Sequence, residues 1–275
     1  MVKKLLKSSV IHFFLITVAV TCLFPLYWML RCSVMTNDTI YTNQSLLPPV
    51  FILDNYREAW QSGNFGVYFI NSIVYTGATV FGIVLVSSLA AFAFSRLRFP
   101  GRNILFLMFV AAMMIPLPGS FVPLVVLMNK LGLADSRLGY ILCMINVGLS
   151  LSILLLKTFF DKMPSDLEDA ARIDGCSKLA IWWNVALPLA RPAIAVIVIF
   201  NSLNVWNEYL LAKLLLTKET LMPLQVGILN FQGASMAKDH ILMAGLTITT
   251  IPIIIIYLIM QKHIIKGLAS GAVKG

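Results

Sequence analysis

A group of polar side chains interrupts the apolar run of about residues 193–216. It consists of three amides and one carboxylate at helical spacing: Asn201, Asn204, Asn207 and Glu208. On a helix these side chains share one face about 120° wide. A charged group inside a bilayer is costly and is by default a functional hypothesis. We expect this stripe to line a path for a polar solute; the alternative is that its members hydrogen-bond neighbouring helices. Two asparagines in other apolar runs are further candidates: Asn71 and Asn146.

A second polar constellation occupies residues 163–192, between two apolar runs. Ser165 and Glu168 have the spacing of a capping box, which predicts a helix beginning near Asp166. Gly175 stands where a helix end requires a residue that tolerates positive φ. Ser177 can cap a second short helix, which Pro188 is expected to end. The segment therefore predicts a helix–glycine turn–helix outside the bilayer.

This helical pair has the features of a docking element. Ala170 and Ala171 allow another surface to approach the backbone closely, and adjacent charged side chains can set the register of the contact. Those side chains are Asp166, Glu168, Asp169 and Arg172. We interpret the segment as a contact site for a soluble partner. The alternative is an interfacial helix whose Trp182 and Trp183 lie at the level of the lipid headgroups.

Composition indicates an all-α polytopic membrane protein. The chain has 275 residues, of which 59% are hydrophobic and 12% charged, and its mean hydropathy is +0.87. The formal net charge of +9 does not indicate nucleic-acid binding, because the basic residues lie at the ends of apolar runs. The cysteines and histidines are scattered, so we expect no metal site. The sequence contains neither a catalytic motif nor a P-loop, so ATP would have to bind another polypeptide.

Six apolar runs predict six transmembrane helices. They cover about residues 10–30, 69–94, 104–128, 138–156, 193–216 and 241–260. The first run is longer than the core of a signal peptide and lacks a cleavage pattern, so we read it as an uncleaved helix. The third contains Pro116, Pro118 and Pro123 and is expected to kink or unwind.

The distribution of lysine and arginine predicts the orientation of these spans. Six spans place both termini on one side, which carries 14 of the 21 basic residues, against 7 on the other side. By the positive-inside rule, the termini and the segment 163–190 face the cytoplasm. The predicted partner is therefore cytosolic.

The helical pair resembles the EAA loop of bacterial ABC importer permeases. The pattern EAA–x3–G–x9–I–x–LP is matched by Asp169-Ala170-Ala171, Gly175, Val185 and Leu187-Pro188. The chain departs from it by aspartate for glutamate at Asp169 and valine for isoleucine at Val185. The resemblance implies that this loop couples the permease to an ATPase through Glu168, Asp169, Ala170, Ala171, Asp174, Gly175, Leu187 and Pro188.

Other segments look like those of carbohydrate-uptake permeases of the maltose and multiple-sugar type. They are Asn55-Tyr56, AFAFSRLRFPGR at 91–102, MMIP at 113–116, ARIDG at 171–175, WNEYLLA at 206–212 and Val273-Lys274-Gly275. The chain is most similar to the smaller, six-helix partner of a heterodimeric permease pair. This implies a type I importer permease fold with three parts. Residues 1–68 form the N-terminus, first helix and extracytoplasmic loop, residues 69–260 the core with its coupling loop at 163–190, and residues 261–275 a cytoplasmic tail.

The resemblance also implies partners and location. It implies an ATP-driven sugar importer in the bacterial inner membrane, with a second homologous permease, two cytoplasmic P-loop ATPase subunits and an extracytoplasmic solute-binding protein. ATP and magnesium would bind the ATPase, leaving this chain without a cofactor and without an enzymatic role. Two other classes remain open from the residues alone: a secondary transporter with Glu208 as a proton-coupling carboxylate, and a membrane enzyme.

Overall fold

The computed structural model describes residues 2–62, 64–115, 117–234 and 238–272, and all the regular structure within them is helical. The expected all-α class is confirmed. The chain forms two compact units. One contains residues 1–66 and 227–252, and the other contains residues 67–226 and 253–275. Each unit is described by itself below.

The first unit contains the first apolar helix and the loop after it. Helix α1 (Val2–Ser33) covers the predicted first span, and two short helices come next, α2 (Asn37–Thr42) and α3 (Asp54–Ser62). The Thr36 side chain and Thr39 form a capping box at the start of α2. The unit also contains the first part of α14 (Asp239–Ala272). Here Lys238 pairs with Glu58 on α3 at 2.7 Å.

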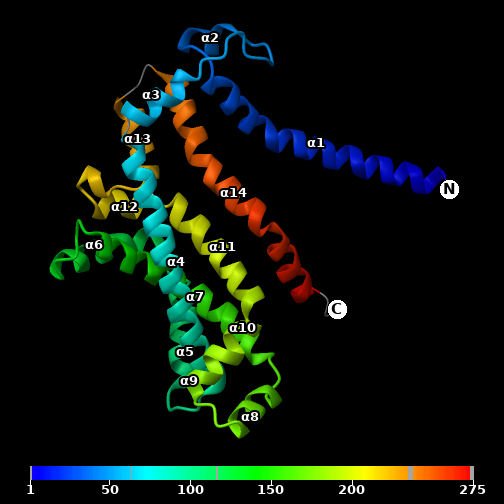
Figure 1. Ribbon diagram of the computed structural model, residues 1–275, viewed down its shortest axis with the longest axis vertical. Coiled ribbons are helices and arrows are strands. Elements are labelled where there is room, and N and C mark those ends of the chain that lie inside the picture. The colour runs from blue at the N-terminus through cyan, green and yellow to red at the C-terminus, as the bar shows by residue number, and fades with distance from the viewer. Residues whose placement is uncertain (1, 63, 116, 235–237, 273–275) are drawn as a thin grey trace. The chain divides into compact units, whose positions relative to one another are not determined.

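The second unit is built around three helices (Figure 1): α4 (Phe65–Arg96), α7 (Arg137–Asp161) and α11 (Arg191–Asn207). The apolar runs of α4 and α7 agree with the predicted second and fourth spans. One buried cluster includes Tyr75, Tyr140 and Val205, and a second includes Ile83, Leu156 and Ile197. Each cluster therefore takes residues from α4, α7 and α11, because long apolar helices bury their side chains mainly against each other.

The third apolar run forms two shorter helices, α5 (Arg102–Ala112) and α6 (Leu117–Lys130). The expected interruption is confirmed, because tight turns at Met113 and Ile115 separate the two helices. Of the three prolines, Pro123 lies inside α6, whereas Pro116 falls outside the described residues. Proline lacks the N–H that an uninterrupted helix requires, so a break in this run is the expected outcome.

The fifth apolar run does not form one continuous helix, as its length had suggested. Helix α11 ends at Asn207, Glu208 is extended at φ −72° and ψ 129°, and α12 (Leu210–Leu215) begins after Tyr209. The Glu208 carboxylate accepts hydrogen bonds from the backbone N–H groups of Leu211 and Ala212. A carboxylate that caps the start of α12 favours a new helix over continuation of α11. A 3₁₀ turn, η2 (Glu219–Leu221), and α13 (Leu224–Ala234) complete this stretch.

The described helices account for at least four of the predicted spans. Those long and apolar enough to cross a membrane are Ser8–Ser33, Phe65–Arg96, Arg137–Asp161 and Asp239–Ile259. A fifth is added if the bent pair Lys178–Leu189 and Arg191–Asn207 counts as one. The total of six, and the side of the membrane on which the termini lie, stay predictions.

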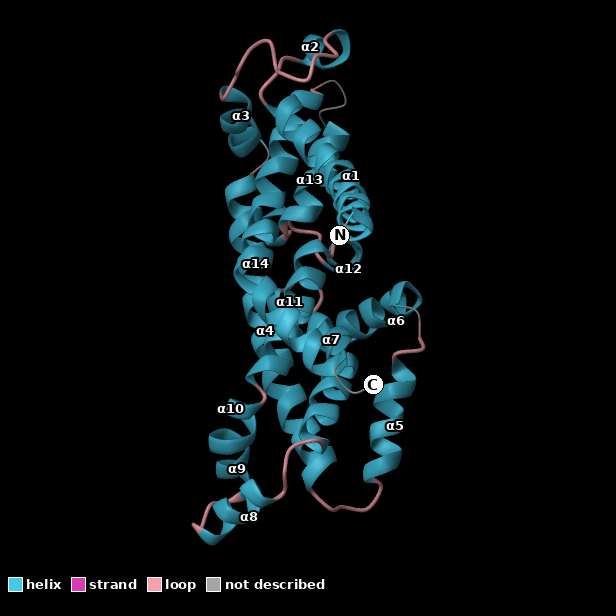
Figure 2. Cartoon of the chain, turned by 90° about the vertical axis from the view of Figure 1, so that its right-hand side faces the viewer, coloured by secondary structure: helices cyan, strands magenta, loops and turns pink. Residues whose placement is uncertain are grey.

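The second unit has two distinct ends. At one end, α8 (Asp166–Ile173), α9 (Lys178–Ile181) and α10 (Leu187–Leu189) lie beyond the ends of α4 and α7. Helices α6 and α12 lie away from α8, near the opposite ends of α7 and α11 (Figure 2). There the Asp135 carboxylate accepts the backbone N–H groups of Lys218 and Thr217, which lowers the pKa of Asp135 from 3.8 to about 2. Asp135 thus ties the loop before α7 to the loop after α12.

Candidate functional site

The helix–turn–helix predicted at residues 163–190 is present, and its turn has the expected glycine geometry. Helix α8 has Asp166, Glu168 and Asp169 in its first turn, where negative charge favours helix formation. Gly175 has a φ of +80°. Its N–H donates to the Arg172 carbonyl, and the next N–H, of Cys176, donates to the Ala171 carbonyl. These two bonds form a Schellman motif, so the prediction for Gly175 is confirmed.

The capping box predicted for Ser165 and Glu168 is wrong. Ser165 has helical angles and its side chain caps no backbone N–H. The Glu168 carboxylate instead lies 2.6 Å from Nε of Arg96 at the end of α4. The Nε–H is not aligned with that oxygen, so the contact is an ion pair rather than a linear hydrogen bond. Attraction to a nearby guanidinium in a poorly hydrated position is stronger than a bond back to an exposed amide.

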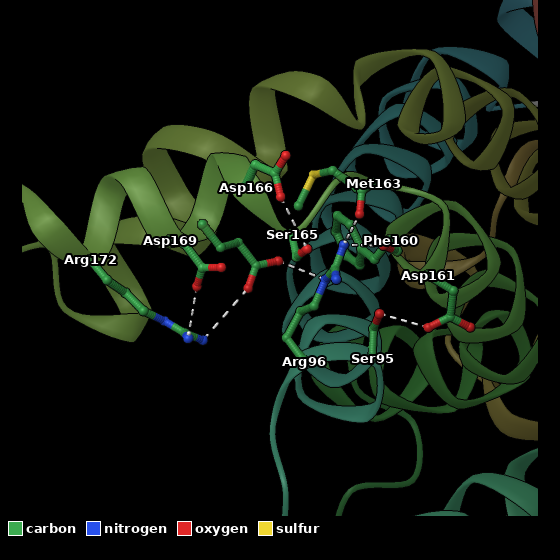
Figure 3. A network of polar contacts seen from close by, with 10 residues as sticks. Ser95, Arg96, Phe160, Asp161, Met163, Ser165, Asp166, Asp169 and Arg172 are labelled. Carbon is green, nitrogen blue, oxygen red and sulfur yellow. Dashed lines mark hydrogen bonds and ion pairs between the residues drawn. The ribbon is translucent and has the colours of Figure 1, made fainter.

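Arg96 connects three segments at this end of the molecule (Figure 3). Its Nη2 donates to the backbone carbonyls of Phe160 and Met163, at 2.5 and 2.6 Å. The side chains of Arg96 and Glu168 are only 15% and 6% exposed. Alongside, Ser95 donates to Asp161, which also pairs with Lys157 at 2.7 Å. The ends of α4 and α7 and the start of α8 are thus held together by buried charge and hydrogen bonds.

The opposite face of α8 is exposed. Asp169 and Arg172 pair on it at 3.3 Å with side chains more than half exposed. Ala170 and Asp174 are also exposed, whereas Ala171 is buried in the cluster that includes Ile83 and Leu156. Large apolar side chains extend the exposed surface: Ile173 is 86% exposed, and Leu179 and Trp183 lie nearby in the same element. Of the predicted coupling residues, Glu168 and Ala171 therefore face inward, and Asp169, Ala170, Asp174 and Gly175 face outward.

The second half of the element continues further than predicted. The Ser177 hydroxyl caps the Ala180 N–H at 3.2 Å, as expected. Helix α9 then passes into a π turn, η1 (Trp182–Ala186), where the Leu187 N–H bonds to the Trp182 carbonyl. Pro188 does not end the helix; it lies in the first turn of α10, where proline needs no hydrogen-bond partner. The wider π turn changes the hydrogen-bond register just before the proline.

The chain turns sharply at Ala190 and enters α11. The helical stretches Lys178–Leu189 and Arg191–Asn207 meet at an angle of 77° with one residue between them. Ala190 is completely buried, as is Ala186 one turn before it. Leu187 and Pro188, the last coupling residues predicted, therefore lie at the joint between the extramembrane element and α11.

The two tryptophans of this element have different environments. Trp182 is buried in the cluster beneath α8, whereas Trp183 is exposed, and their rings lie 5.6 Å apart. Only Trp183 is available to lipid or a partner. The alternative in which both rings lie at the headgroup level is thus not supported for Trp182.

The four-residue polar stripe predicted on the fifth span is not one continuous face. Asn201 is buried, and its amide donates to the Ser152 hydroxyl on α7 at 3.1 Å and to the Ile197 carbonyl. Asn204 and Asn207 are exposed. Glu208 lies beyond the helix end, where its carboxylate also accepts the Tyr140 hydroxyl at 3.0 Å. Glu208 therefore holds α12 to α7, a contact that helical periodicity alone did not indicate.

The other two candidates for the path differ from each other. Asn71 is buried and fully engaged: its amide donates to the carbonyls of Thr220 and Met222, and its oxygen accepts from Arg137 at 2.9 Å. This gives Asn71 a structural role in holding the loop after α12. Asn146 on α7 is exposed. Exposed amides that remain for a polar path are thus Asn146, Asn204 and Asn207.

Sequence reasoning missed Arg96 as the partner of Glu168. An arginine at the end of an apolar run is usual at a membrane boundary, so the sequence offered no signal that it is buried against α8. Within the described residues there is no cluster of three potential metal ligands.

These features describe a helical protein with several helices long and apolar enough to cross a membrane, and with a polar helix–turn–helix that joins directly to the apolar helix α11. A family model described as "Binding-protein-dependent transport system inner membrane component" matches residues 82–270. The chain belongs to this family.

Named relatives and a solved structure agree with that assignment. The chain is 36% identical over 252 residues to a putative ABC transporter permease protein, ORF2, of Caldicellulosiruptor sp., covering 91% of each chain. It is 35% identical to the trehalose transport system permease protein SugB of Mycobacterium tuberculosis, covering 92% of this chain and 93% of the relative. The crystal structure of a bacterial ABC transporter involved in the import of the acidic polysaccharide alginate matches with a TM-score of 0.82 and 27% identity, over 94% of this chain and 96% of that one.

Membership has direct consequences for the chemistry. The chain is a permease, a translocation subunit of an ABC importer rather than an enzyme, and ATP is hydrolysed by a partner. This agrees with the absence of a P-loop in the sequence.

Proposed function

We propose that this permease imports a carbohydrate and that residues 163–190, here called the coupling element, transmit the movement of a cytoplasmic ATPase to the transmembrane helices. The observation that carries the proposal is the attachment of this element at two points. The Arg96–Glu168 pair joins α8 to α4, and the single residue Ala190 joins α10 to α11. A displacement of the element thus acts on two long apolar helices.

The exposed surface of the element suits a protein partner. It combines apolar side chains with charge: Ile173 and Leu179 are exposed beside Asp169 and Asp174. Exposed apolar groups rimmed by polar ones are characteristic of protein interaction sites. Ala170 is exposed between them and allows a partner to approach the α8 backbone.

The proposed substrate class rests on the relatives and on the exposed amides. SugB is named for trehalose transport, and another relative, a diacetylchitobiose uptake system permease of Streptomyces coelicolor, is named for a chitin-derived sugar. Asn146, Asn204 and Asn207 offer amides that can bind sugar hydroxyls at exposed positions of α7 and α11. We assign these three to the translocation path. Asn71, Asn201 and Glu208 have a structural role instead, because they hydrogen-bond neighbouring segments.

The other subunits of the importer and its orientation in the membrane are part of the same proposal. The permease would pair with a second homologous permease, two P-loop ATPases that bind ATP and magnesium, and an extracytoplasmic binding protein. Residues 1–68, 69–260 and 261–275 would form the N-terminal, core and tail parts, with both termini in the cytoplasm. Arg96 contacts the coupling element through Glu168, and Arg98 and Arg102 follow within six residues. This positive charge supports the orientation, because it favours the cytoplasmic side.

The coupling role is tested by placing charge on the exposed apolar surface. We expect Ile173→Arg together with Leu179→Arg to leave membrane insertion unchanged but to abolish co-purification of the ATPase and ATP-dependent uptake. Leu131→Arg is the matched control, because Leu131 is also an exposed apolar residue but comes directly after α6, outside the coupling element. The control should retain both properties.

Two outcomes would contradict the proposal. If the double variant retains the ATPase and transports at the rate of the unaltered protein, the coupling element is not the contact site. If vesicles containing the permease accumulate sugar in response to a proton gradient without ATP, the secondary-transporter alternative with Glu208 is correct instead.

A further inference from the structure

The loop between α2 and α3 presents an uncharged and unusually apolar surface. No charged residue occurs between Asp38 and Asp54. Within this interval Leu47 is 74% and Phe51 72% exposed. Three more large apolar side chains are exposed beside them: Leu46, Val50 and Leu53. An exposed apolar patch of this kind indicates contact with another molecule or with lipid.

The end of this loop that leads into α3 is anchored to the residues where α1 ends. The Ile52 N–H donates to the Val34 carbonyl at 2.8 Å. Asn55, which is buried, donates from its amide to the carbonyls of Ser33 and Met35 at 2.9 and 2.8 Å. The chain therefore leaves α1 and returns to the same point, so the segment between forms a closed loop with a defined position.

The middle of the loop is held beside α1 itself rather than beyond its end. The Tyr27 hydroxyl donates to the Leu46 carbonyl, and Arg31, one turn later, donates to the Asn43 carbonyl at 2.7 Å. Tyr27 precedes the end of α1 at Ser33 by six residues, which is about 9 Å along a helix. Figure 1 shows the loop at this end of α1. The bonds to Tyr27 and Arg31 thus hold the loop alongside the last two turns of α1.

The positive charge of Arg31, which contacts the loop, is shielded. Arg31 is buried, and its guanidinium lies 4.6 Å from the centre of the Trp28 ring, a cation–π contact. Tyr27 and Trp28 are of the types that concentrate at membrane–water interfaces. The loop surface at this depth therefore carries apolar side chains without an exposed charge to oppose their insertion into lipid.

We propose that Leu46–Leu53 lies in the boundary between headgroups and acyl chains, at the membrane face where α1 ends, and contacts lipid through its exposed apolar side chains. The occupant is lipid because the loop is continuous with, and bonded to, a helix that spans the membrane, at the level of its interfacial aromatics. It would fix the depth of α1 in the bilayer. The inference requires α1 to span the membrane but does not rest on the proposed coupling role or substrate.

Collision rates of a spin label with reagents of different solubility test this placement. The assembled importer would be studied in lipid nanodiscs with a nitroxide attached to Leu47→Cys or Phe51→Cys. The matched control is Arg57→Cys, at an exposed and charged position on α3. The four native cysteines would first be replaced by alanine: Cys22, Cys32, Cys143 and Cys176. Transport by this cysteine-free protein would be verified before labelling.

We expect labels at positions 47 and 51 to collide with oxygen, which concentrates in lipid, at least about threefold more often than the label at 57. Collisions with a water-soluble nickel chelate should be lower by a similar factor. Nickel collisions equal to those at Arg57→Cys would show that the loop is in water and would overturn the proposal. Low collision rates with both reagents would show that protein covers the loop, and this too would overturn it.

Discussion

Neutralising Glu168 should weaken the attachment of α8 to α4 without removing the helix. In Glu168→Gln the side chain keeps its size but loses the charge that pairs with Arg96 across 2.6 Å. Removing one partner of a buried ion pair costs about 3–5 kcal/mol. Arg96 keeps two carbonyl acceptors and is partly exposed, so we expect a cost at or just below the lower end of that range, about 2–3 kcal/mol.

This loss has a measurable consequence in local opening. At about 1.4 kcal/mol for each tenfold change in an equilibrium constant, the undocked population of α8 should rise about 30- to 150-fold. Backbone amides in the second half of α8 should lose hydrogen-exchange protection by that factor, because exchange reports local unfolding. The measurement is hydrogen exchange with mass spectrometry on the permease in nanodiscs.

A neighbouring residue supplies the control. Asp169→Asn removes the exposed pair with Arg172 on the same helix, and exposed pairs contribute about 0–1 kcal/mol. Its exchange should therefore change less than about fivefold. Equal protection in Glu168→Gln and the unaltered protein would refute the argument that the Arg96–Glu168 pair holds α8 in place.

Three substitutions test other contacts. Gly175→Val should leave insertion intact but abolish uptake, because a β-branched residue at φ +80° is strained by more than about 1–2 kcal/mol; normal uptake would disprove the role of the turn. Glu208→Gln should lower the unfolding temperature more than Tyr140→Phe, because it disturbs two backbone N–H bonds besides the tyrosine contact. Asp135 has a pKa lowered to about 2, so the stability that it contributes is complete above its ordinary pKa of 3.8 and is lost as pH falls towards 2. The difference in unfolding temperature between Asp135→Asn and the unaltered protein should therefore be constant above about pH 5 and shrink as the pH falls through 3.8 towards 2; a difference that is undiminished near pH 2 would contradict this.

Features governed by nearby residues were predictable from the sequence. Gly175 and Ser177 act through backbone groups within a few positions, so their turn and cap follow from local chemistry. The long apolar helices α4 and α7 follow from composition alone. The spacing of the coupling element also carried the family resemblance, which the comparisons confirmed.

Features governed by distant contacts were not predictable in the same way. The capping box failed because Glu168 meets Arg96, a residue from another helix, and the periodicity of α8 contains no information about α4. The stripe failed at Glu208 because its carboxylate begins α12 instead of continuing α11. In both cases the side chain contacts a group that only the folded structure brings near, instead of the partner expected from its position in the sequence.

Because a single residue separates α10 from α11, the number of residues at this point determines how α11 is oriented relative to α10. Each residue added to a helix turns the remainder of that helix by about 100°. A residue inserted at the start of α11 would therefore rotate the rest of that helix and exchange the buried Asn201 with side chains that are now exposed, even if every original residue remained.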